Sequence, residues 1–419
     1  MVQCAMAAAP PVSARFPRPV IKVLLLENVH ASAHEIFAGE GFQVEAVPRA
    51  LKEEELVERL AGGVNLLGIR SKTRVTAKAL EAGKDLLSVG CFCIGTNQVD
   101  LEAAKRCGVP VFNAPFSNTR SVAELVICEV VMLSRHLGDR SREVHEGRWR
   151  KVATGSREVR GKTLGIIGYG HIGSQVGVLA EAMGMRVISY DIRATLPMGN
   201  NRPVESLETL LKESDFVTLH VPETPETRGM IGAPQLARMR AGACLLNLSR
   251  GTVVDLEALA AAIRERRVGG AAVDVYPEEP EKNGDDFRSP LRGLPNVILT
   301  PHVGGSTEEA QESIGREVAA SLIKFAGQGA TTAAVNFPEV EVAQKPGLHR
   351  ILNVHRNVPG VLRDINRIVS DCDANIERQV LATDPAIGYL LMDLNAEVSA
   401  EVLERVGALS TSSRTRVLW

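Results

Sequence analysis

Most of the chain alternates between short apolar runs and longer stretches in which apolar residues recur every three or four positions. The short runs predict buried strands, and the longer stretches predict amphipathic helices. Their regular alternation predicts parallel sheets with helices on both faces, which is an α/β fold. The first strands are expected at 21–27, 41–47, 66–69 and 87–91, with helices at 31–39, 52–60 and 77–82.

A second alternating region begins with a long apolar helix pattern at 121–137 and a helix with one charged face at 141–149. Six apolar runs follow, which is the number of strands in a two-lobed dinucleotide-binding sheet. A further helix is expected from about 305 to 327. The six expected strands are 163–167, 187–190, 216–220, 244–247, 270–274 and 297–299.

The pattern changes after a linker at 329–347 that contains Pro338 and Pro346. The remaining segments predict the order β-α-β-β-α-β, which is a split ferredoxin-like module. The expected strands are 348–355, 375–382, 389–394 and 414–418, and the expected helices are 359–370 and 399–409.

Composition narrows the class of protein. A length of 419 residues predicts two or three domains. With 48 basic and 50 acidic residues and no basic tract, the chain is not expected to bind nucleic acid. No stretch reaches the roughly 18 apolar residues of a membrane helix, so no membrane partner is expected.

The cysteines and the N-terminus bear on location. An odd number of cysteines without framework spacing predicts reduced thiols and a cytoplasmic protein. The C-x-C of Cys91 and Cys93 lacks a second ligand pair, so no metal site is expected. Residues 1–18 lack the apolar core of a secretory signal and predict a flexible extension, with an organelle transit peptide as the alternative. The seven cysteines are Cys4, Cys91, Cys93, Cys107, Cys128, Cys244 and Cys372.

A glycine motif follows the expected strand 163–167. Gly168, Gly170 and Gly173 form a G-x-G-x-x-G that opens a helix, and Asp191 ends the next strand. This context is the dinucleotide fingerprint, in which glycines admit the pyrophosphate to a helix N-terminus and the acid binds the ribose hydroxyls. The Asp191 charge would repel a 2′-phosphate, which favours NAD over NADP.

Three polar residues follow strands of the same expected sheet. Arg250, Glu279 and His302 would converge at its carboxyl edge, where ligands bind. Arginine can hold a carboxylate with two parallel hydrogen bonds, and histidine can take a hydroxyl proton near neutral pH. Glu279 would fix the histidine tautomer and raise its pKa. This set fits hydride transfer from a 2-hydroxy acid.

Long motifs in the chain are similar to those of one family. They are GCFCIGTNQVD at 90–100, FNAPFSNTRSVAE at 112–124 and TPHVGGST at 300–307. Over roughly 20–419 the chain closely resembles the D-isomer-specific 2-hydroxyacid dehydrogenases. Within them it resembles the members that oxidise 3-phospho-D-glycerate to 3-phosphooxypyruvate with NAD, the first step of L-serine synthesis. The resemblance also implies reduction of 2-oxoglutarate to 2-hydroxyglutarate.

The resemblance implies a discontinuous organisation and a set of roles. A flavodoxin-like substrate domain would comprise 19–117 and 305–346, a Rossmann-type NAD domain 118–304, and an ACT regulatory domain 347–419. Arg250 would bind the carboxylate, His302 would be the acid/base and Glu279 its partner. The implied NAD contacts are Gly168, Gly170, His171, Ile172, Gly173, Asp191, His220, Leu248, Ser249, Arg250, Asp274, His302, Val303, Gly304 and Gly305.

Positive charge is expected where a substrate phosphate binds. Arg70 and Lys72 end a strand two positions apart and so share a face. They match positions that the family uses for the phosphate, with Asn118 and Lys151 as further candidates. Relatives often carry arginine where this chain has Lys72. The resemblance also implies that the loop with Cys93 and Ile94 lines the substrate.

The C-terminal module resembles an ACT domain, which binds amino acids between paired copies. His355, Asn357 and Asn375 match positions that contact serine in the family. The resemblance therefore implies serine as an allosteric inhibitor and a homotetramer. Trp149 is expected on a helix, either in the core or at an oligomer contact.

Two other functions stay open on sequence alone. One is a dehydrogenase for a non-phosphorylated D-2-hydroxy acid, against which Arg70, Lys72 and the C-terminal module argue. The other is a non-enzymatic NAD-sensing protein like the transcriptional co-repressors of this fold, which keep the same three residues.

Overall fold

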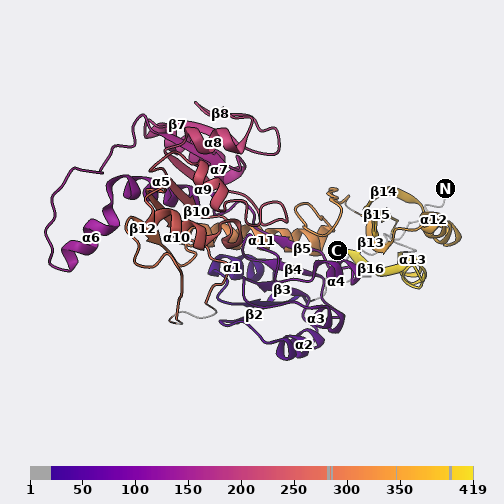
Figure 1. The fold of residues 1–419 in the computed structure, drawn as a ribbon. Helices are drawn as coiled ribbons and strands as arrows, with labels where there is room; N and C mark the ends of the chain where they lie inside the picture. Colours follow the sequence, from indigo (N-terminus) through magenta and orange to yellow (C-terminus); the bar gives the residue numbers. More distant parts are fainter. Residues whose placement is uncertain (1–19, 281–283, 285, 346, 396–398, 419) are drawn as a thin grey trace, which may run out of the picture. The chain divides into compact units, whose positions relative to one another are not determined.

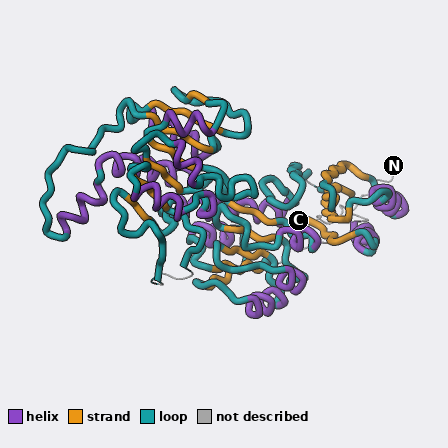
Figure 2. Tube along the Cα trace, viewed as in Figure 1, coloured by secondary structure: helices purple, strands orange, loops and turns teal. Residues whose placement is uncertain are grey.

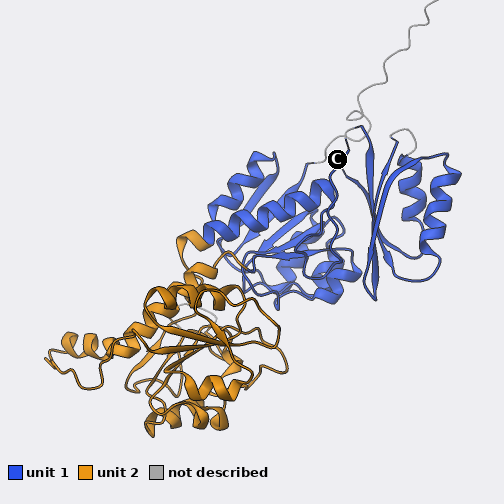
Figure 3. Ribbon diagram, turned by 90° about the horizontal axis from the view of Figure 1, so that it is seen from above, with its two compact units in different colours: residues 1–115, 311–419 blue, residues 116–310 orange. Residues whose placement is uncertain are grey.

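The chain folds into two compact units. One contains residues 116–310, and the other contains the segments before and after it (Figure 3). The predicted extension at 1–18 lies outside the described residues. The computed structural model describes residues 20–280, 284, 286–345, 347–395 and 399–418.

Residues 116–310 are built on a parallel sheet of seven strands in the order β12-β11-β10-β9-β6-β7-β8. Figure 1 labels β7, β8, β10 and β12 of this sheet. This doubly wound order reverses between β6 and β9, which is where such sheets bind ligands. All six predicted strands are confirmed; β8 has two residues and no apolar run, so the pattern could not indicate it. The strands are β6 (Thr163–Ile167), β7 (Arg186–Tyr190), β8 (Arg202–Pro203), β9 (Phe216–Leu219), β10 (Cys244–Asn247), β11 (Gly270–Val273) and β12 (Val297–Leu299).

Helices cover both faces of this sheet (Figure 2). Successive strand residues point to opposite faces, so Leu245 and Leu246 belong to different hydrophobic clusters. Leu246 packs with residues of α5 and α7, and Leu245 packs with residues of α8, α9 and α10. The helices are α5 (Thr119–Arg135), α7 (His171–Ala182), α8 (Leu207–Glu213), α9 (Ala233–Arg238) and α10 (Leu256–Arg264), with a short 3₁₀ helix at Gly251–Val253.

The prediction of a helix through Trp149 is wrong. Helix α6 spans Leu137–His145, and Trp149 lies in the loop after it with 84% of its surface exposed. Gly147 has a φ of 77°, a conformation that ends helices readily. A core position for Trp149 is therefore excluded, and an oligomer contact stays a prediction.

The other unit contains a parallel sheet of five strands in the order β2-β1-β3-β4-β5. This is the flavodoxin-like order. The predicted strands and helices are confirmed, whereas α4 and β5 were not predicted. The elements are β1 (Lys22–Leu26), α1 (Ala31–Gly39), β2 (Gln43–Val47), α2 (Glu53–Ala61), β3 (Leu66–Ile69), α3 (Ala77–Ala82), β4 (Ser88–Cys91), α4 (Leu101–Arg106) and β5 (Val111–Asn113).

The predicted β-α-β-β-α-β module is confirmed in the same unit. Its antiparallel sheet has the order β14-β15-β13-β16. The long helix α11 (Glu308–Gln328) precedes it. The module consists of β13 (His349–Arg356), α12 (Val361–Asp371), β14 (Ile376–Thr383), β15 (Ile387–Leu394), α13 (Ser399–Gly407) and β16 (Ser412–Leu418).

The C-terminal module shares a hydrophobic core with α11 and the five-stranded sheet. Phe325 of α11 lies 6.0 Å from Phe112 of β5, measured between ring centroids. The guanidinium of Arg416, on β16, lies 4.9 Å from the centre of the Phe325 ring. The Tyr389 hydroxyl donates to the carbonyl of Gly329 at 2.6 Å. The module is therefore packed against α11 rather than joined only by the linker.

A buried ion pair completes this contact. Arg350 donates to both carboxylate oxygens of Asp393, at 2.6 and 2.8 Å, and the two side chains are 1% and 2% exposed. Its other guanidinium donors bind the carbonyls of Gln328, Val342 and Ala343 at 2.7 to 3.2 Å. A buried guanidinium is costly unless it is paired. The partners of Arg350 come from the module, the linker and the end of α11, so this site joins the three segments.

We expect Asp393→Ala to lower the free energy of unfolding by about 3–5 kcal/mol, because it leaves the Arg350 charge buried without its counter-charge. Arg363→Ala breaks the exposed pair with Asp364 and should cost no more than about 1 kcal/mol. Chemical denaturation of the two variants measures the difference. Equal losses of unfolding free energy in the two variants would contradict the stabilising role of the buried Arg350–Asp393 pair.

Candidate active site

The turn between β6 and α7 is shaped by its glycines. Gly168 has a φ of 89°, and a Cβ there would lie 2.4 Å from the carbonyl oxygen of His220. A Cβ on Gly173 would lie 2.2 Å from the Gly168 carbonyl oxygen, whereas one on Gly170 would meet no atom within 4 Å. No side chain caps α7. Bare backbone and free amide groups therefore face open space at a helix N-terminus, an arrangement that binds phosphate groups.

Asp191 directly follows β7 beside this turn. Its carboxylate accepts hydrogen bonds from the backbone amides of Tyr169, at 2.7 Å, and Arg193, at 2.9 Å. These bonds fix the carboxylate next to the glycine turn. The turn, the free amides and this acid together fit a dinucleotide.

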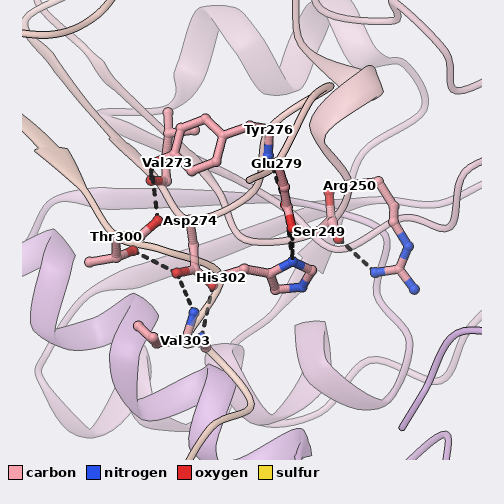
Figure 4. A network of polar contacts seen from close by, with 10 residues as sticks. Ser249, Arg250, Val273, Asp274, Tyr276, Glu279, Thr300, His302 and Val303 are labelled. Carbon is pink, nitrogen blue, oxygen red and sulfur yellow. Dashed lines mark hydrogen bonds and ion pairs between the residues drawn. The ribbon is translucent and has the colours of Figure 1, made fainter. Parts of the chain in front are cut away.

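The ring of His302 is held by Glu279. The Nδ1 atom lies 2.9 and 3.0 Å from the two carboxylate oxygens (Figure 4). A carboxylate only accepts hydrogen bonds, so Nδ1 carries the proton and Nε2 is the atom that can accept one. His302 also has a φ of 55°, a left-handed conformation that costs energy in a residue other than glycine. Strain of this kind persists where surrounding contacts fix the residue.

The same contact shifts both pKa values. The hydrogen bond from Glu279 raises the pKa of His302 above its usual range, and partial burial opposes this effect. Burial pushes the pKa of Glu279 upward, but the hydrogen bond and charge of His302 hold it below the usual range. Glu279 is thus ionised at neutral pH and favours the imidazolium form of His302.

Arg250 follows β10 in a turn that Asn247 fixes. The Asn247 side chain donates to the Arg250 carbonyl at 3.0 Å and accepts from the amide and hydroxyl of Ser249 at 3.1 and 2.8 Å. Nη1 of Arg250 donates to the Ser249 carbonyl at 2.7 Å (Figure 4). The sequence analysis missed Asn247, although a polar residue ending an apolar strand is a signal for it.

Asp274 fixes the loop that carries His302. Its carboxylate accepts from the Thr300 hydroxyl at 2.6 Å and from the amides of Val303 and Gly304, both at 2.8 Å (Figure 4). The Asp274 side chain is buried. The loop on both sides of His302 is therefore tied to the end of β11.

A second buried acid, Glu129, lies on α5 and was also missed. It is 1% exposed, and neither carboxylate oxygen has a hydrogen-bond partner in the described part of the chain. Burial, and then the negative charge of Asp274, raise the pKa of Glu129 to about 8. Glu129 is therefore neutral at pH 7. Its position on the buried face of α5, beside Val126 and Val130, is a signal that sequence could have supplied.

His220 follows β9 close to the glycine turn. Its Nε2 lies 3.0 Å from the Thr218 hydroxyl, and its Nδ1 is buried without a partner among the described residues. Burial lowers the pKa of His220 to about 3, so the ring is neutral. The other predicted NAD contacts also follow strands of this sheet or begin α7. They are His171, Ile172, Leu248, Ser249, Val303, Gly304 and Gly305.

The predicted substrate residues divide between the units. Arg70 and Lys72 follow β3, and Cys93 and Ile94 follow β4, all in one unit. Burial raises the pKa of Cys93 to about 11, so it is a neutral thiol that donates to the Gly95 carbonyl at 3.2 Å. The residues in the other unit are Asn118, at the start of α5, Lys151, in the exposed loop after α6, and Arg250.

The three predicted serine contacts do not meet within one chain. The side chain of Asn357 donates to the Asp384 carbonyl at 2.7 Å, near His355 at the end of β13. Asn375 precedes Ile376, which lies at the other end of the sheet through the pairs Ile376–Leu394 and Leu394–His349. Six residues of strand separate the two ends, or about 20 Å.

The described residues contain neither a metal-binding cluster nor a membrane-spanning helix. No group of three or more His, Cys, Asp or Glu residues there could hold a metal ion. Cys91, Cys93, Cys107, Cys128, Cys244 and Cys372 are free thiols. No described helix is both long and apolar enough to cross a membrane.

We expect Glu129 to make the free energy of unfolding depend on pH. Its pKa is higher in the folded chain than in the unfolded chain, so folding holds a proton between about pH 4.5 and about 8. The free energy of unfolding should therefore fall as pH rises through this window, by on the order of a few kcal/mol. Glu129→Gln should lose that dependence, so its stability relative to wild type should improve between pH 5 and pH 8.5 in denaturant titrations.

Glu124→Gln is the matched control, because Glu124 is exposed on the same helix and pairs with Arg120. This variant should follow the wild type at both pH values. Parallel pH curves for Glu129→Gln and the wild type would show that Glu129 is ionised in the folded protein.

Comparison with known proteins agrees with this geometry. Residues 127–304 match the model of the D-isomer specific 2-hydroxyacid dehydrogenase NAD binding domain. Residues 351–412 match an AHAS small subunit-like ACT domain. NAD is therefore the cofactor, and the C-terminal module is an ACT domain, as the sequence predicted.

Solved structures share the fold of the dehydrogenase part. The NAD-complexed D-isomer specific 2-hydroxyacid dehydrogenase of Lactobacillus delbrueckii is 26% identical, with a TM-score of 0.65 over 73% of this chain and 97% of that one. A D-lactate dehydrogenase of Sporolactobacillus is 31% identical, with a TM-score of 0.65 over 75% of this chain and 99% of that one.

Relatives match nearly the full length. The D-3-phosphoglycerate dehydrogenase of Dictyostelium discoideum is 54% identical over 96% of this chain and 98% of its own length. The enzyme of that name from Escherichia coli is 49% identical over 95% of this chain and 98% of its own. The chain is thus an NAD-dependent oxidoreductase that belongs to the D-isomer-specific 2-hydroxyacid dehydrogenase family, in its D-3-phosphoglycerate dehydrogenase branch.

Proposed function

We propose that this protein oxidises 3-phospho-D-glycerate to 3-phosphooxypyruvate with NAD, the first step of L-serine biosynthesis. The pairing of His302 with Glu279, at the carboxyl edge of an NAD-binding sheet, carries the proposal. The names of the full-length relatives support the substrate. Reduction of 2-oxoglutarate stays a prediction.

Each polar residue has a role in this reaction. Nε2 of His302 takes the proton of the C2 hydroxyl, and Glu279 stabilises the imidazolium that forms. The Arg250 guanidinium holds the substrate carboxylate. The free amides of α7 and the Asp191 carboxylate would hold the pyrophosphate and ribose of NAD, which would supply the hydride acceptor for C2.

The phosphate end of the substrate requires cations. Arg70 follows β3, and no acid lies within ion-pair distance of its guanidinium among the described residues. Arg70 is therefore available to a phosphate group, and Lys72 lies two positions further along the same loop. Cys93 and Ile94 line the same end, and Asn118 and Lys151 are further candidates.

We also propose that serine inhibits the enzyme through the ACT domain. His355 and Asn357 would contact it from one copy and Asn375 from another, which is consistent with their separation on the sheet. Binding between copies requires an oligomer, and we propose the homotetramer that the family resemblance implies, in the cytoplasm.

The deciding experiment measures initial rates of NADH oxidation with 3-phosphooxypyruvate and with hydroxypyruvate, each with and without serine. We expect a strong preference for the phosphorylated substrate and inhibition by serine. Equal rates on both would indicate a dehydrogenase for non-phosphorylated acids. An absence of turnover on either would indicate an NAD-sensing protein.

The pH dependence of oxidation should report the Glu279–His302 pair. His302 must be neutral to accept a proton, so kcat/KM for 3-phospho-D-glycerate should rise as pH passes its raised pKa. Glu279→Gln removes the charge that favours the imidazolium, so this limb should move to lower pH. His302→Ala should reduce turnover at least about 100-fold at every pH. An unmoved limb in Glu279→Gln would separate Glu279 from the acid/base step.

A further inference from the structure

The loop that carries Arg70 and Lys72 is tied to a buried acid on the neighbouring strand. Glu27 follows β1, and its two carboxylate oxygens accept from the backbone amides of Lys72, at 2.9 Å, and Thr73, at 2.7 Å. β1 pairs in parallel with β3, so the two strand ends are adjacent. Glu27 is only 8% exposed. Hydrogen bonds to a charged acceptor are about twice as strong as neutral ones, so this tie is firm.

The backbone at Glu27 adopts a costly conformation. Glu27 has a φ of 63° and the next residue, Asn28, a φ of 53°. Two consecutive non-glycine residues in the left-handed region cost about 1 kcal/mol or more each. Such a pair persists only where contacts compensate for it. Here the Glu27 carboxylate accepts hydrogen bonds from two backbone amides, and the Glu27 amide donates to the Val47 carbonyl at 3.0 Å.

Gln98 ties the same loop from the other side. Its amide nitrogen donates to the Arg70 carbonyl at 2.6 Å and to the Gly95 carbonyl at 3.1 Å. Asn113 in turn donates to the Ile94 carbonyl at 2.5 Å. The loops after β3 and β4, which carry the four predicted substrate contacts of this unit, are thus held by three buried side chains.

We propose that Glu27 and Gln98 are positioning residues for the phosphate end of the substrate, which fix the loop of Arg70 and Lys72 before the substrate binds. The inference rests on the proposed function. An untied loop must lose about 1–2 kcal/mol of backbone entropy per residue when the phosphate orders it. A loop that is already ordered avoids this cost, which strengthens binding without changing the chemical step.

Glu27→Gln tests the acid. An amide has one acceptor oxygen, so one of the two backbone bonds is lost. We expect KM for 3-phosphooxypyruvate to rise about 10-fold, which corresponds to about 1.4 kcal/mol. The kcat should stay within about 2-fold, because the tie acts on binding rather than on the chemical step. The kcat/KM for hydroxypyruvate, which lacks the phosphate, should not change.

Gln98→Glu is the second variant. It replaces a donor by an acceptor that faces the carbonyls of Arg70 and Gly95. KM for 3-phosphooxypyruvate should therefore rise again, while kcat/KM for hydroxypyruvate stays unchanged. Glu45→Gln is the charge-matched control, because Glu45 lies on β2 of the same sheet with a side chain that is 62% exposed. This control should leave both KM values unchanged.

The outcomes separate the two proposals. If wild type prefers 3-phosphooxypyruvate but neither variant raises its KM, the positioning role is overturned. An equal rise of KM on both substrates also overturns it, because that result indicates a general structural defect. If wild type shows no preference for the phosphorylated substrate, the proposed function itself fails.

Discussion

Parallel sheets bring the loops of neighbouring strands to one edge, where many backbone amides lack partners, and in this protein acids satisfy them across the strands. Three acids that follow strands accept hydrogen bonds from backbone amides in the loop after the adjacent strand. They are Asp191 after β7, Asp274 after β11 and Glu27 after β1. Buried amides without partners are costly, so each acid both stabilises the fold and sets the position of a ligand loop. The candidate site depends on this bracing.

The two buried acids near the His302 loop differ in their hydrogen bonds. The Asp274 carboxylate accepts three, from the Thr300 hydroxyl and from the amides of Val303 and Gly304. Glu129 has none among the described residues, so its burial favours the neutral form. Two ionised carboxylates beneath the His302 loop would repel each other. A neutral Glu129 avoids this repulsion, and Asp274 holds the loop through its three hydrogen bonds.

The sequence predicted the elements and residues whose signals are local. The glycine turn follows from spacing within six residues, and Arg250, Glu279 and His302 follow from their positions after strands. Glu27 gave no such signal, because the amides it binds lie 45 and 46 residues away in the sequence. Its role depends on the pairing of β1 with β3, which only the folded chain shows. The prediction for Trp149 was wrong although its signal was local. The apolar residue stands at helical spacing, but the helix ends before it, at His145.

The strand register of the ACT domain limits where the proposed serine site can form. His355 and Asn375 lie at opposite ends of its sheet, so a molecule as small as serine cannot contact both within one chain. A site that uses both positions must form between two copies. The module is also packed on α11 through Phe325 and tied there by Arg350. In the proposed regulation, a ligand bound between copies would act on a module that packs directly on α11, so a change in how the copies pair would reach α11 through these contacts.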